Sequence, residues 1–166
     1  SGKTTLIEII LGLIKPGGTQ ISLDKKHKID NLFSSLRVGY VKQENILIFD
    51  TIIENIVLDL NNFDEERYQM AKFFSYIEQD IDLKNDRNRI KNINQKLSGG
   101  QKQKIAIARA IYFGKDILIF DEATNSLDQQ SEKFIFNNIL KLNNLLFIYT
   151  THSKTNFKYA TKTIEV

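Results

Sequence analysis

The chain begins with five residues whose types and order suit phosphate chemistry: Ser1, Gly2, Lys3, Thr4 and Thr5. The Lys3 ammonium can reach the terminal phosphates of a ligand, and the Thr4 hydroxyl can bind Mg²⁺. An apolar, helix-forming stretch follows, and the first amides of that helix would point at the anion. A glycine followed by lysine and threonine occurs by chance in many proteins, so this interpretation needs support from other parts of the chain.

Two adjacent carboxylates, Asp121 and Glu122, follow the short apolar run Ile117–Phe120. At the edge of a core they would repel each other unless a cation or a catalytic role held them there, although a solvated pair at a strand end is the alternative. Beside a phosphate loop, Asp121 would hold Mg²⁺ through water and Glu122 would orient or deprotonate the attacking water. His152 follows the apolar run Leu145–Tyr149 in the same way. A lone histidine is usually structural, but this one is expected at the same sheet edge, within reach of a γ-phosphate.

A second anion site is predicted where residues 97–111 read LSGGQKQKIAIARAI. The two glycines do not favour a helix, yet an apolar-periodic helix follows them directly. Ser98 and the free amides of Gly99 and Gly100 would meet phosphate at a positive helix end, whereas the alternative is an ordinary flexible turn. One chain would then carry two half-sites for one kind of ligand, which suggests a dimer.

The elements that must position these residues follow from periodicity. Apolar residues at helical spacing predict a buried helix from Thr4 to Ile14, ended by the Pro-Gly-Gly sequence at residues 16–18. Residues 20–24 alternate like a strand, and residues 37–41 predict a strand that delivers Gln43 at its end. Together with the apolar runs at residues 117–120 and 145–149, these strands indicate an α/β fold with a parallel sheet covered on both faces. In such a fold the functional residues lie at the carboxyl ends of the strands.

The middle of the chain has a different pattern. Residues 51–54 match the capping box, in which a threonine hydroxyl and a glutamate carboxylate each satisfy a free backbone N–H at a helix start. A helix is predicted over residues 64–77, and the polar residues 82–96 are predicted to form a loop. This region is expected to be a small helical insertion in the α/β core.

Composition narrows the class of protein. The 166 residues, 42% of them hydrophobic, suit one domain or part of one, and the absence of cysteine excludes disulfides and thiolate metal sites. No stretch reaches the ~18 to 20 apolar residues of a membrane span, and no signal peptide is recognised. The net charge of +3 is spread over scattered lysines, so a solvated surface is favoured and no nucleic-acid partner is expected.

The chain resembles the nucleotide-binding domain of an ABC (ATP-binding cassette) ATPase over essentially its whole length. Six motifs occur in the family's order: the end of Walker A at Ser1–Thr5, the Q-loop at Gln43, the signature at Leu97–Gln101, Walker B at Ile117–Glu122, the D-loop at Ser126–Asp128 and the H-loop at His152. The resemblance implies a P-loop NTPase core with a parallel sheet, here residues 1–50 and 95–166, and a small helical subdomain at residues 51–94.

The same resemblance implies ATP and Mg²⁺ as ligands. It assigns catalytic roles to Glu122, His152 and Gln43, metal binding to Thr4, Gln43 and Asp121, and nucleotide binding to Ser1, Gly2, Lys3, Thr4, Thr5, Ser98, Gly99, Gly100 and Gln101. Two cassettes would close head to tail, with each ATP held by Walker A, Walker B, Gln43 and His152 of one subunit and by the signature of the other. Closure and reopening would drive a partner.

Among members of the family, the sequence TIIENI at residues 51–56 resembles exporter cassettes, which are usually fused to membrane helices. We therefore expect an exporter-type transport ATPase at the cytoplasmic face of a membrane, with the transmembrane domains of a transporter as partners. Residues 88–96 lack the acidic residue that exporters usually carry before the signature, and THS stands where exporters usually have AHR. The alternatives are a soluble ABC ATPase of translation or DNA repair and a stand-alone importer ATPase subunit.

Only the second half of the family's phosphate loop, G-x-x-G-x-G-K-[ST], is present at the start of the chain. The chain is therefore expected to be an internal fragment of a cassette, truncated at both ends. ATP hydrolysis is expected of the completed cassette, and whether the fragment alone hydrolyses ATP is left open.

Overall fold

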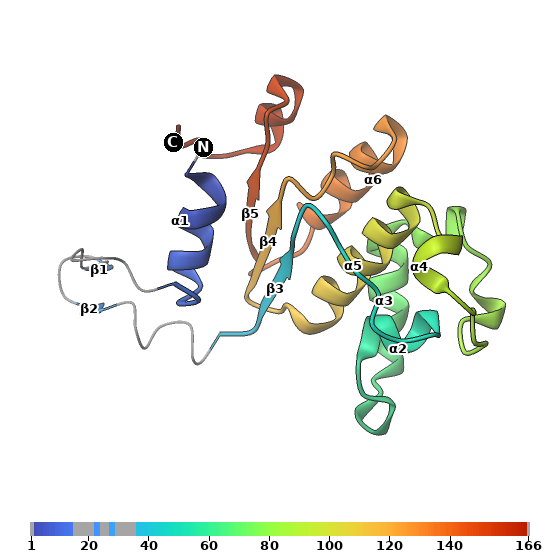
Figure 1. The fold of residues 1–166 in the computed structure, drawn as a ribbon. Coiled ribbons are helices and arrows are strands. Elements are labelled where there is room, and N and C mark those ends of the chain that lie inside the picture. Colours follow the sequence, from blue (N-terminus) through green and yellow to red (C-terminus); the bar gives the residue numbers. More distant parts are fainter. Residues whose placement is uncertain (1, 15–21, 24–26, 29–35, 166) are drawn as a thin grey trace.

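A computed structural model describes residues 2–14, 22–23, 27–28 and 36–165. Its centre is a three-stranded parallel sheet in the order β3 (Val38–Val41), β4 (Ile117–Asp121) and β5 (Leu146–Thr150). All three strands run in one direction, so their carboxyl ends lie at one edge of the sheet (Figure 1). The predicted parallel α/β fold is confirmed.

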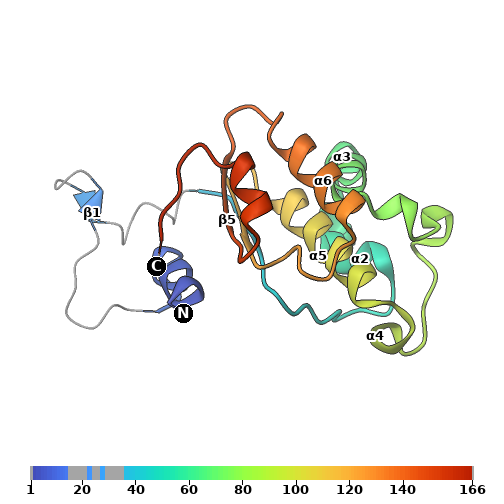
Figure 2. The ribbon, with the colours of Figure 1, turned by 90° about the horizontal axis from the view of Figure 1, so that it is seen from above.

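The two faces of the sheet are covered by different helices, α1 (Lys3–Ile10) on one face and α5 (Gly99–Phe113) with α6 (Gln129–Ile139) on the other (Figures 1 and 2). Alternate residues of β4 point to the two sides: Ile117 and Ile119 pack with Ile7 of α1, whereas Leu118 and Phe120 join the core beneath α5. Coverage is complete only for β4, which is buried throughout. β5 is half-exposed, because it has a paired strand on one side alone within the described sheet.

The prediction of a buried helix from Thr4 to Ile14 is wrong in length and in burial. α1 ends at Ile10, because Gly12 adopts a left-handed φ of 71°. The Gly12 and Leu13 amides donate to the carbonyls of Ile9 (3.0 Å) and Glu8 (2.8 Å), which is the pattern of a Schellman C-cap. Of α1, the sheet buries only Ile7, because one face of the helix contacts β4 and the other faces away from it.

The strand predicted at residues 20–24 lies mostly outside the described residues. Two of its residues form β1 (Ser22–Leu23), which pairs antiparallel with β2 (His27–Lys28). The Pro-Gly-Gly sequence at residues 16–18 also lies outside the described part of the chain.

The middle region forms α2 (Ile52–Val57) and α3 (Glu65–Ser75), which pack against α5 and share its core. Thr51 caps α2, since its hydroxyl accepts the Glu54 N–H at 3.2 Å, but the Glu54 carboxylate contacts that hydroxyl and not a backbone amide. The loop predicted at residues 82–96 contains α4 (Ile93–Lys96) and a 3₁₀ turn, η4 (Leu83–Asn85). The remaining 3₁₀ turns are η2 (Leu60–Asn62), η3 (Ile77–Gln79) and η5 (Lys154–Tyr159).

The division between core and helical subdomain at residues 50 and 95 stays a prediction. Within the described ranges, we find no helix whose length and apolar character would let it cross a bilayer.

Candidate functional site

Three predicted site residues meet at the carboxyl edge of the sheet. Lys3 comes from the start of α1, Glu122 directly follows β4, and His152 follows β5. The Lys3 Nζ lies 3.7 Å from Glu122 Oε1, and His152 Nε2 lies 2.9 Å from the same oxygen. The His152 ring also lies against the lysine, with Nδ1 3.3 Å from Nζ. A ring with its proton on Nε2 would donate to Glu122, and the Lys3 Nζ lies 3.1 Å from that same ring nitrogen.

Glu122 is held in an uncommon backbone conformation, with a φ of 51°. Its amide donates to the hydroxyl of Thr150 on β5 at 2.9 Å, and its Oε2 accepts from the Asn125 side-chain amide at 3.2 Å. The Lys3 and Glu122 side chains are each only 18% exposed. The carboxylate therefore sits in a partly desolvated position, beside a cation and a histidine.

Asp121 is buried beside this cluster, with 4% of its surface exposed. Its Oδ1 accepts from the Thr150 hydroxyl at 2.7 Å, and its Oδ2 accepts from the Tyr40 hydroxyl at 3.4 Å. Burial, followed by the negative charges of Asp121 and Glu8, raises the pKa of Tyr40 to about 12. Tyr40 therefore stays a proton donor to Asp121 at physiological pH.

Sequence reasoning missed Thr150, Tyr40 and Asn125. The available signal was position, because Tyr40 and Thr150 stand near the ends of the strands that flank β4. Side chains there meet the residues that follow β4.

The start of α1 suits a phosphate group. Gly2 is its N-cap and provides no side-chain cap hydrogen bond, so the first helical amides are left for another acceptor. Thr4 and Thr5 are exposed in the first turn, and the Lys3 ammonium lies near the Glu122 carboxylate at the same edge. Ser1 lies outside the described residues.

The predicted metal ligands Thr4, Gln43 and Asp121 supply a hydroxyl, an amide and one carboxylate. The described ranges contain no group of three or more His, Cys, Asp or Glu side chains that could hold a metal on their own. Mg²⁺ commonly binds through one or two carboxylates together with substrate phosphates, so this set fits Mg²⁺ that arrives with a nucleotide.

Gln43 is exposed two residues beyond β3, on a segment anchored from both sides. The Lys42 ammonium pairs with Glu8 of α1 at 3.1 Å, and the Lys42 carbonyl accepts from the Gln103 side chain of α5 at 3.3 Å. Asn45 donates to the same carbonyl at 2.8 Å. The strand thus delivers Gln43 to the expected edge.

The second predicted half-site, Ser98–Gln101, starts α5 on the other side of the sheet from α1 (Figure 2). Here the capping box is complete: Ser98 Oγ accepts the Gln101 N–H at 3.2 Å, and Gln101 Oε1 accepts the Ser98 N–H at 2.9 Å. A Cβ at Gly100 would lie 3.0 Å from the Ser126 carbonyl oxygen, a tight contact that would require a small shift of the D-loop. No hydrogen bond or ion pair among the described residues joins this half-site to Lys3, Glu122 and His152.

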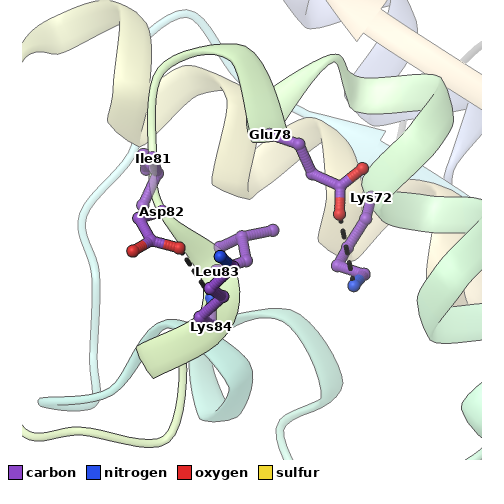
Figure 3. A pocket seen from close by; sticks show the side chains of 6 residues that line it. All are labelled: Lys72, Glu78, Ile81, Asp82, Leu83 and Lys84. Carbon is purple, nitrogen blue, oxygen red and sulfur yellow. Dashed lines mark hydrogen bonds and ion pairs between the residues drawn. The ribbon is translucent and has the colours of Figure 1, made fainter.

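A separate pocket of about 330 Å³ lies in the helical region, lined by Lys72, Glu78, Ile81, Asp82, Leu83 and Lys84 (Figure 3). Three of its charged side chains already have partners, since Lys72 pairs with Glu78 at 3.4 Å and Asp82 accepts the Lys84 backbone N–H at 3.0 Å. None of the predicted site residues lines it.

Comparisons with known proteins agree with this geometry. The family model for ABC transporters matches residues 1–125. The chain is 37% identical over 140 residues to an ATP-dependent lipid A-core flippase of Ralstonia nicotianae, and 40% identical over 145 residues to the chloroplastic ABC transporter B family member 29 of Arabidopsis thaliana. These matches cover 80% and 81% of this chain but only 24% and 22% of the relatives, so the chain spans about a quarter of their length.

Among solved structures, a bacterial Atm1-family ABC exporter with ATP bound superimposes with a TM-score of 0.76 at 27% sequence identity, covering 94% of this chain and 28% of that one. Sequence and fold agree in that match, and the family model covers most of the chain. The chain therefore belongs to the ABC transporter family.

Proposed function

We propose that the chain is the ATP-binding and ATP-hydrolysing motor of an ABC exporter, which moves a substrate across a membrane by ATP-dependent dimerisation. The observation that carries this proposal is the meeting of Lys3, Glu122 and His152 at the sheet edge, with Asp121 buried beside them. The flippase and exporter relatives support the exporter type.

Each residue has a role that its position supports. The first amides of α1 and the Lys3 ammonium bind the terminal phosphates, while Thr4, Gln43 and Asp121 hold Mg²⁺. When bound, Mg²⁺ would neutralise part of the negative charge of the phosphates. Phosphate binding draws Lys3 away from Glu122, which leaves the carboxylate free to accept a proton from the attacking water. His152, already in contact with Glu122, orients that carboxylate and lies beside the phosphate.

The half-site Ser98–Gln101 is proposed to face the nucleotide of a second cassette in a head-to-tail dimer. Gly99 and Gly100 present amides at a positive helix end, and the capping box fixes their direction. Residues 51–94 are proposed as the helical subdomain, and the transmembrane domains of the transporter as further partners at the cytoplasmic face of the membrane.

The experiment that tests this proposal is Glu122→Gln in the product of the complete open reading frame that encodes this chain. Removing the base should lower the rate of phosphate release by at least about a hundredfold, while a fluorescent ATP analogue still binds. Glu66→Gln is the matched control, because Glu66 is an exposed carboxylate on α3. Hydrolysis near the parent rate in Glu122→Gln, or no nucleotide binding by the parent protein, would contradict the proposed function.

A further inference from the structure

Thr150 is the last residue of β5 and lies directly opposite Asp121 in the parallel register. Its hydroxyl makes two hydrogen bonds, donating to Asp121 Oδ1 at 2.7 Å and accepting from the Glu122 N–H at 2.9 Å. A hydroxyl has one proton to donate and lone pairs to accept, so one oxygen can serve both neighbours. A single side chain therefore contacts both members of the acidic pair.

The hydrogen bond from the Glu122 N–H to the Thr150 hydroxyl lies directly after β4, where the backbone leaves the sheet. With a φ of 51°, Glu122 is in the left-handed region, which non-glycine residues adopt only when their surroundings hold them there. The Thr150 hydroxyl gives the Glu122 N–H an acceptor in this conformation. The conformation directs the carboxylate to Lys3 and His152.

The bond to Asp121 is charge-assisted and correspondingly short. On the other side, the Tyr40 hydroxyl reaches Oδ2 at 3.4 Å, so hydroxyls from both neighbouring strands hold the one carboxylate. A carboxylate fixed in this way has a defined orientation before a metal arrives, and such outer contacts tune metal affinity.

We propose that Thr150 is a positioning residue, which sets the Asp121 carboxylate for Mg²⁺ and the Glu122 carboxylate for the attacking water. This inference rests on the proposed ATPase function. It makes the Thr150 hydroxyl, and not its methyl group, the part of the side chain that matters.

Two matched pairs of variants in the full-length protein isolate that hydroxyl. Thr150→Val keeps the shape of the side chain and removes the hydroxyl, and the pair Thr150→Ser and Thr150→Ala lacks the methyl and differs in the hydroxyl alone. Thr155→Val is the control, because Thr155 is exposed and its hydroxyl has a single hydrogen-bond partner, Ser153, among the described residues. Each variant is measured for kcat, KM for ATP, the Mg²⁺ concentration at half-maximal rate, and binding of a fluorescent ATP analogue in Mg²⁺ and in EDTA.

Thr150→Val and Thr150→Ala should lower kcat and raise the half-maximal Mg²⁺ concentration by about tenfold or more, with KM for ATP changed less than about twofold. In these two variants, the affinity for the analogue in EDTA should stay at the parent value, and the increase in affinity on adding Mg²⁺ should become smaller. Thr150→Ser should restore kcat and the Mg²⁺ dependence. Parent values of kcat and Mg²⁺ requirement without the hydroxyl would overturn the proposal, as would equal losses in Thr150→Ser and Thr150→Ala. If Thr150→Val does not fold, the serine and alanine pair decides.

The two proposals fail in distinguishable ways. Loss of turnover in Glu122→Gln together with normal behaviour of Thr150→Val would remove the role of Thr150 and leave the ATPase function standing. Normal turnover in Glu122→Gln would remove the function itself.

Discussion

Lys104 is a charged residue in the interior, with only 1% of its side chain exposed. Its ammonium pairs with Asp80 Oδ2 at 2.6 Å and lies over the Tyr76 ring, 5.2 Å from the centroid. Gln101 donates to the Asp80 carbonyl at 3.0 Å, so the same residue contacts α5 twice. Asp80 therefore fixes the segment after η3 against the first turns of α5, where the second half-site begins.

Removing only the Asp80 carboxylate should lower the free energy of unfolding more than removing both members of the pair. Asp80→Ala leaves a buried ammonium without its partner and should lower the free energy of unfolding by about 2–3 kcal/mol, which is less than a fully buried pair costs because Asp80 is 36% exposed. Lys104→Met introduces an apolar side chain of similar length and should lower the free energy of unfolding by less than about 1 kcal/mol. The double variant, Asp80→Ala with Lys104→Met, should be about as stable as Lys104→Met alone. Melting midpoints of the four proteins check this, and a double variant as unstable as Asp80→Ala would contradict it.

At the scale of elements, short apolar runs and turn residues predicted the three strands of the parallel sheet within one residue. The apolar periodicity of residues 97–111 also predicted α5, in which Ile105, Ala108 and Ile111 are buried. Periodicity failed for α1, because a nearly continuous apolar sequence does not reveal that only one face meets the sheet. The same reasoning also predicted that α1 ends at the Pro-Gly-Gly sequence of residues 16–18, although the left-handed backbone of Gly12 ends this helix earlier.

The packing of α5 on β3 depends on a close approach of two backbones. A Cβ on Gly39 would lie 2.1 Å from the Ala110 carbonyl oxygen, which cannot move without shifting the helix. Gly39→Ala should therefore destabilise the protein by about 3 kcal/mol. Gly12→Ala is the comparison, because its left-handed φ costs about 1 kcal/mol but nothing lies within 4 Å of the new methyl group. Thermal unfolding measures both, and equal losses would argue against a steric cause at Gly39.

At the scale of the whole molecule, the sequence predicted which residues follow the strands, and parallel topology explains why Lys3, Glu122 and His152 meet. The sequence placed Tyr40 and Thr150 near strand ends, but it did not show that they contact Asp121, because that contact depends on strand register, which local patterns do not encode. Within one chain the two predicted half-sites lie apart, since α5 begins on the face of the sheet opposite α1 (Figure 2). This separation is the structural reason to expect that each nucleotide needs a second copy.

A mixing experiment with two inactive full-length variants tests that expectation. Lys3→Ala removes the phosphate-binding cation, and Ser98→Glu places a negative charge at the second half-site, so each variant alone should have both composite sites disabled. In a mixed head-to-tail dimer, the Lys3 of one chain and the Ser98 of the other form one intact site. Random exchange of subunits at equal concentrations should restore about one quarter of the parent sites, because half of the dimers are mixed and each has one intact site. Phosphate release from the mixture measures this recovery, with each variant alone as the control. A mixture as inactive as its components, despite demonstrated subunit exchange, would show that Ser98 does not complete the site of its neighbour.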